Sequence, residues 1–179
     1  MIDFSRNHFD LFGLPVRFRL DPVQLDGAFR RLQSEVHPDR HAAGGDADKR
    51  LALQASAQVN AAYGTLKDPV SRAEYLLALH GIDARDETDT RLPLDFLERQ
   101  LERREEADDA AAQRDLRTLS AIQQQVREES AELEAVLATL LDGDDRSAAR
   151  ERVRELRFLS KVAEDLRALE ARVDEAVED

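Results

Sequence analysis

Apolar positions recur at three-, four- and seven-residue steps along two stretches of the first half of the chain, which predicts two amphipathic helices. The first is expected over residues 22–36 and the second over residues 49–66. Pro38 disfavours helix at the residue before it, so the first helix should end at about His37. The expected apolar faces are Val23, Phe29, Leu32 and Val36, and then Leu51, Ala55, Val59, Ala62 and Leu66. Together these helices predict a hairpin with His37-Pro38-Asp39 at its turn.

Shorter elements flank this hairpin. An apolar segment at residues 9–13 is expected to form a short helix that docks on it. Asp21 is a good N-cap residue, and Pro22 fits the first helical position after it. Asp68 and Pro69 repeat the pattern, which predicts another helix that ends near Gly81.

The second half of the chain shows three longer helical patterns, over residues 93–112, 114–141 and 147–177. The sequence Asp-Gly-Asp-Asp at residues 142–145 breaks the pattern between the last two. In the middle segment the apolar residues follow near-heptad steps: Leu116, Leu119, Ile122, Val126, Leu133, Val136 and Leu140. Three helices with short connections predict an antiparallel three-helix coiled-coil bundle.

A polar and charged stretch, residues 82–92, separates the two halves and is interpreted as a linker. The expected domains are therefore residues 1–81 and residues 93–179. With 36% charged and 5% aromatic residues in 179, and with a helical period throughout, the composition predicts an ordered, all-α protein.

Several classes of protein are disfavoured by composition. The chain has no cysteine, which excludes disulfides and cysteine-ligated zinc or iron–sulfur sites within it. Residues 1–7 lack the apolar core of a signal peptide, and no apolar run is long enough to span a bilayer. We therefore expect a cytoplasmic protein with no membrane association, no metal and no cofactor.

The net charge of −12 is unevenly distributed. Residues 1–80 carry ten acids and ten bases, whereas residues 81–179 carry 28 acids and 16 bases. An acidic second half is repelled by phosphate backbones, so nucleic acid is not expected as a partner. It favours a partner with a basic face. We expect the protein itself to be a monomer.

Carboxylates form a stripe along the first helix of the second half. At 100° per residue they fall within about 60° of one another on the helix surface. The stripe consists of Glu98, Glu102, Glu105 and Asp109, bordered by Leu97 and Leu101. A self-repelling stripe beside two leucines suits a basic, partly apolar partner. The alternative is a solvated acidic face near a helix N-terminus. Phe158 on the third helix is either packed in the bundle or offered to a partner, and the pattern alone favours packing.

The order of motifs in the first half resembles that of J-domains over about residues 7–79. The resemblance rests on Phe9-Asp10-Leu11-Phe12-Gly13-Leu14, His37-Pro38-Asp39, Asn60-Ala61-Ala62-Tyr63, Leu66-Lys67-Asp68-Pro69 and Arg72-Ala73-Glu74-Tyr75. It implies docking on a DnaK-type chaperone and stimulation of its ATPase. The implied contact residues are Arg30, Arg31, His37, Pro38, Asp39 and Arg40. A solvated basic face is the alternative interpretation of Arg30 and Arg31.

The second half of the chain, together with the J-domain motifs, resembles the HscB family of iron–sulfur cluster co-chaperones. This resemblance rests on the run from Leu94 to Glu106, on Leu156-Arg157-Phe158-Leu159, and on Arg72-Ala73-Glu74-Tyr75-Leu76-Leu77. The resemblance implies an L-shaped arrangement of the two domains, a bundle that binds the scaffold protein IscU, and a J-domain that engages the chaperone HscA. The implied scaffold-binding residues are Leu97, Glu98, Leu101, Glu102, Glu105, Asp109 and Phe158.

The chain departs from that family at a few positions. Glu98 stands where methionine is usual, and Arg103 where an apolar or aromatic residue is common. Binding through the implied scaffold-binding residues should therefore depend more on charge. Arg40 replaces the commoner lysine and keeps its charge. The cysteine zinc module of eukaryotic relatives is absent, which points to a bacterial type.

The resemblance implies an adaptor without catalysis of its own, and two alternatives stay open. One is a general J-protein whose acidic bundle binds unfolded clients. The other is a metal-binding enzyme that uses His37, Asp39 and His41, with His8 or His80 completing the site. The chain offers no phosphate-binding glycine loop or nucleophile constellation to support an enzyme.

Overall fold

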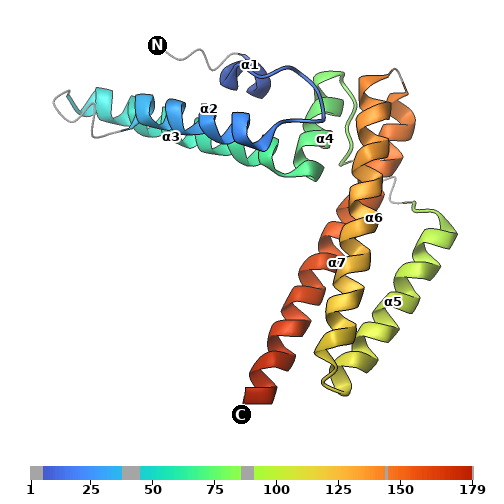
Figure 1. Ribbon diagram of the computed structural model, residues 1–179. Coiled ribbons are helices and arrows are strands. Elements are labelled where there is room, and N and C mark those ends of the chain that lie inside the picture. Colours follow the sequence, from blue (N-terminus) through green and yellow to red (C-terminus); the bar gives the residue numbers. More distant parts are fainter. Residues whose placement is uncertain (1–5, 38–44, 86–90, 144, 179) are drawn as a thin grey trace. The chain divides into compact units, whose positions relative to one another are not determined.

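The computed structural model describes residues 6–37, 45–85, 91–143 and 145–178. Within these ranges the chain forms seven α-helices and no strand, which confirms the predicted all-α class (Figure 1). The chain divides into two compact units, Met1–Ile82 and Asp83–Asp179. Apolar side chains are buried in each of them. No helix of the described residues is long and apolar enough to cross a membrane.

The first unit holds α1 (His8–Phe12), α2 (Pro22–Val36), α3 (Asp46–Lys67) and α4 (Pro69–Leu79). α2 and α3 lie side by side as the predicted hairpin (Figure 1). The side chains of Asp21 and Asp68 accept hydrogen bonds from Val23 N at 2.9 Å and from Ser71 N at 2.7 Å, so both act as the predicted N-caps. Each cap is followed by proline in the first turn.

The seam between α2 and α3 uses a slightly different set of residues from the predicted one. Val23 and Leu51 are 79% and 62% exposed, so the predictions that they face the hairpin core are wrong. Val23 lies about 160° around the helix from Leu25, and Leu25 takes its place. Ala52 replaces Leu51 because it keeps the seven-residue step to the next core positions. The buried seam residues are Leu25, Ala28, Val36, Ala52, Val59, Ala62 and Leu66.

The second unit contains α5 (Leu94–Ala112), α6 (Leu116–Asp142) and α7 (Arg146–Glu178), which form the predicted three-helix bundle (Figure 1). A tight turn joins α5 to α6, and Arg114 in this turn adopts a left-handed conformation with φ of 56°. The side chain of Asp115 caps α6 by accepting a hydrogen bond from Thr118 N at 3.1 Å. All three helices contribute to the core, with Phe96, Ala107, Ala110, Leu119, Ile122, Val126, Leu159, Leu166 and Val173.

The heptad pattern predicted for α6 fails at one position. Val136 is 46% exposed, whereas Leu137 is fully buried. Leu137 lies 18 residues after Leu119, which is five full turns at 3.6 residues per turn, so the two side chains project in the same direction. The core of this long helix therefore follows the helical period of 3.6 residues and not a strict seven-residue repeat.

Parts of the predicted linker are tied to α7. The Arg157 guanidinium donates to the carbonyl oxygen of Ala84 at 3.0 Å, and that of Arg154 donates to the carbonyl oxygen of Arg91 at 3.4 Å. Ala84 is itself buried. Residues 86–90 lie outside the described residues, so the interpretation of 82–92 as a linker stays a prediction.

Candidate functional site

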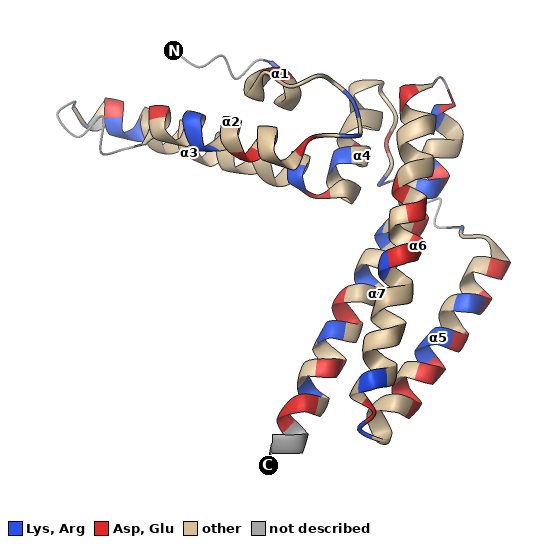
Figure 2. Cartoon of the chain, in the orientation of Figure 1, with Lys and Arg blue, Asp and Glu red and all other residues tan. Residues whose placement is uncertain are grey.

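Helix α5 presents three different sides to its surroundings. Its core side buries Phe96, Gln100, Ala107 and Ala110. Next to this side, Leu97 and Leu101 remain 39% and 59% exposed. The carboxylates lie further round, and acidic residues recur along the whole helix with arginines between them (Figure 2). The exposure of two adjacent leucines on a well-packed helix makes this side of α5 the first place to look for a partner.

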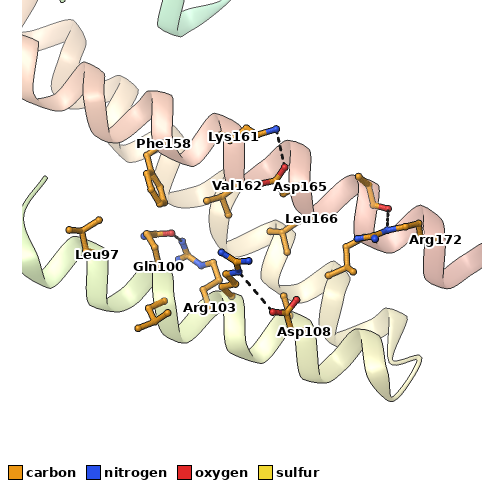
Figure 3. A pocket seen from close by; sticks show the side chains of 15 residues that line it. Leu97, Gln100, Arg103, Asp108, Phe158, Lys161, Val162, Asp165, Leu166 and Arg172 are labelled. Carbon is orange, nitrogen blue, oxygen red and sulfur yellow. Dashed lines mark hydrogen bonds and ion pairs between the residues drawn. The ribbon is translucent and has the colours of Figure 1, made fainter. Parts of the chain in front are cut away.

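A groove of about 620 Å³ runs between α5 and α7 beside these leucines (Figure 3). One end of it has Leu97 and Phe158, and the other has Asp108 and Arg172 (Figure 3). Its apolar lining is Leu97, Leu101, Ala107, Phe158, Val162, Leu166, Ala168 and Leu169. Its polar lining is Gln100, Arg103, Arg104, Asp108, Lys161, Asp165 and Arg172. The structure thus brings together three of the predicted scaffold-binding residues: Leu97, Leu101 and Phe158.

Phe158 is packed in the bundle, as the pattern favoured, and part of its ring is exposed along the groove. Its ring meets that of Phe96 edge to face, with the centroids 5.6 Å apart and an angle of 79° between the planes. It packs against the core of the unit and also lines the groove. A half-buried aromatic of this kind is held in place by the core while part of it remains available to a partner.

The acid stripe lies outside the groove. Glu98, Glu102, Glu105 and Asp109 are all exposed, and none of them lines the groove. A partner seated on Leu97 and Leu101 would meet these carboxylates at its edge. Exposed charges at the rim of an interface act mainly on the association rate and on the choice of partner.

A polar network that the sequence reasoning missed lies on the core side of α5. The side chain of Arg103 is only 12% exposed, and its guanidinium pairs with Glu129 on α6 at 2.8 Å. It also donates to Gln100 Oε1 at 2.5 Å. Arg99 reaches the same glutamate at 3.8 Å. The signal was available, because Arg103 shares a helical face with Phe96 and Ala107.

Gln100 carries an incompletely satisfied amide at this site. The residue is 5% exposed, and its Nε2 atom is shut off from solvent without a hydrogen-bond partner among the described residues. An unpaired buried donor costs about 1–3 kcal/mol, so this amide weakens the attachment of α5. The middle of the α5 seam is polar, whereas its two ends are apolar.

A second buried charge lies on α7. Glu155 is 3% exposed, and both of its oxygens lie 2.7 Å from Nη1 of Arg152. Burial raises the pKa of the Glu155 carboxyl, and Arg152 acts in the opposite direction. Asp95 and Arg99 on α5 also act on this group, with opposite signs.

The chaperone-binding residues predicted for the first unit are only partly described. Arg30 and Arg31 are exposed on α2, and His37 is the C-cap residue of that helix. Pro38, Asp39 and Arg40 lie outside the described residues. Their predicted contacts therefore stay predictions.

The metal-binding alternative also falls largely on residues that are not described, because Asp39 and His41 lie outside the described ranges. Among the residues that are described, no three His, Cys, Asp or Glu side chains cluster as metal ligands would. His8 stacks on Tyr75, with the ring centroids 4.2 Å apart and the planes at 9°. Burial lowers the pKa of its imidazole.

Comparison with known proteins places these features in a family. Residues 92–178 match the family model of the HSCB C-terminal oligomerisation domain. The chain is 46% identical over 168 residues to the "Co-chaperone protein HscB homolog" of Burkholderia multivorans, covering 94% of this chain and 96% of that protein. The corresponding protein of Burkholderia pseudomallei is 45% identical over the same length and coverage.

Solved structures agree with this result. Chaperone HscB from Vibrio cholerae has a TM-score of 0.83 at 37% identity, covering 94% of this chain and 99% of that one. The human co-chaperone protein HscB has a TM-score of 0.81 at 29% identity, covering 93% and 83% of the two chains. The helical order of the first unit is that of a J-domain-like fold. The chain therefore belongs to the HscB family of co-chaperones.

Proposed function

We propose that this protein is an adaptor of iron–sulfur cluster assembly. It binds the scaffold protein IscU through the α5–α7 side of its second unit and delivers it to an HscA/DnaK-type chaperone. It stimulates the ATPase of that chaperone through its J-domain and catalyses no reaction itself. The observation that carries this proposal is the pair of exposed leucines, Leu97 and Leu101, beside the half-buried Phe158 along one groove.

The scaffold contact combines an apolar centre with a charged rim. Leu97, Leu101 and Phe158 provide apolar area whose burial is worth about 25 cal/mol per Å². The exposed carboxylates beside them select a partner with a basic rim. Glu98 belongs to this rim in our proposal, although an apolar residue is usual at its position in the family.

The chaperone contact lies on the first unit. Arg30 and Arg31 on the exposed side of α2 provide positive charge close to the end of that helix, where His37, Pro38 and Asp39 follow. In this proposal Asp39 makes polar contacts at the chaperone and is not a catalytic base. Binding two partners to one chain raises their effective concentration for each other, and delivery needs no further chemistry.

A general J-protein that binds unfolded clients remains the second candidate, because the apolar lining of the groove also suits an exposed hydrophobic segment. The two candidates differ in their dependence on charge. A folded scaffold with a basic rim depends on the acid stripe, whereas an unfolded apolar segment depends mainly on Leu97, Leu101 and Phe158. Reversing two charges of the stripe therefore separates them.

The test is the single-turnover ATPase rate of the chaperone, measured with and without the scaffold. Three variants are compared with the wild type: Asp39→Asn, Glu102→Arg/Glu105→Arg, and the control Glu128→Arg/Glu132→Arg on the exposed face of α6. We expect Asp39→Asn to abolish stimulation altogether. The stripe variant should lose only the scaffold-dependent part, and the control should keep both.

Two results would contradict the proposal. If the wild type does not stimulate the chaperone, the J-domain function is wrong. If the stripe variant retains scaffold-dependent stimulation while a denatured protein competes with the scaffold for the wild type, the client-binding candidate is correct.

A further inference from the structure

The groove between α5 and α7 extends well beyond the predicted scaffold contacts. Leu97 and Phe158 lie at one end of it (Figure 3), and Leu101 follows one turn after Leu97 on α5. Further along, both helices contribute charged side chains to the lining: Arg104 and Asp108 of α5, and Asp165 and Arg172 of α7, while Lys161 lies one turn after Phe158. The apolar side chains of Leu166 and Leu169 also line this part of the groove. The groove is thus apolar at one end and charged at the other.

The sign of these charges is opposite to that of the rest of the unit. Four bases and two acids line the groove, whereas residues 81–179 as a whole carry 16 bases and 28 acids. Arg103 is already neutralised by Glu129 at 2.8 Å. The remaining lining still has three bases, Arg104, Lys161 and Arg172, against two acids.

Among the described residues, these bases are only partly neutralised. Lys161 is held by Asp165 at 3.0 Å, but Arg104 approaches Asp108 no closer than 4.0 Å, with both side chains highly exposed. Arg172 donates Nε to the carbonyl oxygen of Ala168 at 3.3 Å, which is not a charged partner. Each of these two guanidinium groups, one on each wall of the groove, is therefore suited to receive a carboxylate.

We infer that the groove receives one segment of the scaffold in a single direction, with apolar side chains at the Leu97 and Phe158 end and carboxylates further along it, at Arg104 and at Arg172. The inference rests on the proposed function and adds the orientation and the acidic groups. The reverse orientation would bury Arg104 and Arg172 against apolar groups and leave them without partners, which is strongly unfavourable.

The spacing of the two ends defines the segment further. Leu97 and Arg104 are seven residues apart on α5, and Phe158 and Arg172 are fourteen residues apart on α7. At 1.5 Å per residue these steps correspond to about 10 and 20 Å along the groove. The scaffold segment should therefore carry carboxylates about 10 Å and about 20 Å from its apolar anchor. It should also lie close to basic residues that meet the acid stripe.

The chain offers a matched control for the test. Arg167 and Arg172 are both exposed on α7, and each donates Nε to the carbonyl oxygen four residues earlier, at 3.1 and 3.3 Å. Only Arg172 lines the groove. We expect Arg172→Glu and Arg104→Glu each to weaken binding of the scaffold about fivefold or more by calorimetry, because a like charge would face the incoming carboxylate. Arg167→Glu should change the affinity less than about twofold.

A charge-swap experiment identifies the partner group. Individual Asp and Glu residues of the scaffold are changed to Lys, and one of these variants should restore binding to Arg172→Glu. The inference is overturned if Arg172→Glu and Arg104→Glu bind the scaffold as tightly as Arg167→Glu does. Leu101→Ala distinguishes a failure of this inference from a failure of the proposed function. If it weakens binding while both charge reversals do not, only the inference fails, and if the wild type does not bind the scaffold, the proposed function fails.

Discussion

The ring of Phe158 lies edge to face against that of Phe96, with 5.6 Å between the centroids. Phe96 on α5 is 2% exposed, whereas Phe158 on α7 is half-buried and lines the groove. The contact couples the two walls of the groove at its apolar end. A change at Phe158 should therefore affect both the stability of the bundle and the binding of a partner.

Substitutions at Phe158 should separate these two effects. Phe158→Ala is expected to lower the free energy of unfolding by about 2 kcal/mol, less than for a fully buried ring. Phe158→Leu should lower the free energy of unfolding by about 1 kcal/mol, which is the contribution of the aromatic pair. Both variants should bind the scaffold more weakly. Urea denaturation and calorimetry measure the two quantities, and a Phe158→Leu variant that binds like the wild type would show that the ring is not a contact.

The ion pair between Arg103 and Glu129 should be measurably coupled. Of the charged partners of Glu129 among the described residues, Arg103→Met leaves only Arg99, at 3.8 Å, and the change should be destabilising. The double variant Arg103→Met/Glu129→Met should recover most of the loss, because both charges are then absent. A double-mutant cycle by urea denaturation should give a coupling energy of about 1–2 kcal/mol. A coupling near zero would mean that the pair is solvated and adds nothing to the seam.

The unpaired amide of Gln100 makes an unusual stability prediction. Gln100→Met keeps the volume and removes the unsatisfied donor, so we expect stability to stay unchanged or to rise by up to about 1 kcal/mol. Gln100→Ala leaves a cavity instead and should cost about 2 kcal/mol. Thermal and urea denaturation of the two variants provide the comparison. A large loss in Gln100→Met would indicate that its bond with Arg103 outweighs the unpaired donor.

Glu155 should make the stability of the bundle depend on pH. Burial raises the pKa of this carboxyl in the folded state above its value in the unfolded chain, so the folded state holds the proton more tightly. The stabilisation is therefore fully present below the unfolded pKa of about 4.3 and is lost as the pH rises through the folded pKa.

Glu155→Gln mimics the protonated form and isolates this effect from the other carboxylates. Relative to the wild type, the variant should gain stability as the pH is raised from about 4 to about 7. Urea denaturation of both proteins across this range measures the difference. A difference that does not change with pH would mean that Arg152 and Arg99 together compensate for the burial.

The predictable part of the fold is the part governed by local chemistry. Asp21 and Asp68, each followed by proline, marked the helix starts because an N-cap and its proline act within one turn. The errors at Val23, Leu51 and Val136 arose where several apolar residues were close in sequence and only one could face the core. Which of them does so depends on the packing against a neighbouring helix, which periodicity does not determine.

The candidate site was predictable to a smaller extent. The pattern on α5 identified Leu97 and Leu101 as two leucines that border the carboxylate stripe. The charged end of the groove was not predicted, because it combines side chains such as Arg104 and Arg172 from helices that are far apart in sequence. Arg103 was interpreted as part of the partner-binding face. It does line the groove, but Glu129 pairs with its guanidinium and holds it against the core, because its helical position coincides with that of Phe96 and Ala107.

The residues on the core side of α5 decrease in size along the helix, from Phe96 near its start to alanines near its end. Ala107, Ala110 and Ala111 lie near the turn into α6, the polar pair Gln100 and Arg103 occupies the middle, and Phe96 occupies the far end. Small residues allow close approach of two helices, and bulky ones hold them apart. We therefore expect the distance between α5 and the rest of the bundle to increase toward Phe96, and to depend on the few large side chains at that end. Substitutions at buried positions near Phe96 should widen or narrow the binding groove. They should thereby change which partners bind, although no residue on the exposed surface is altered.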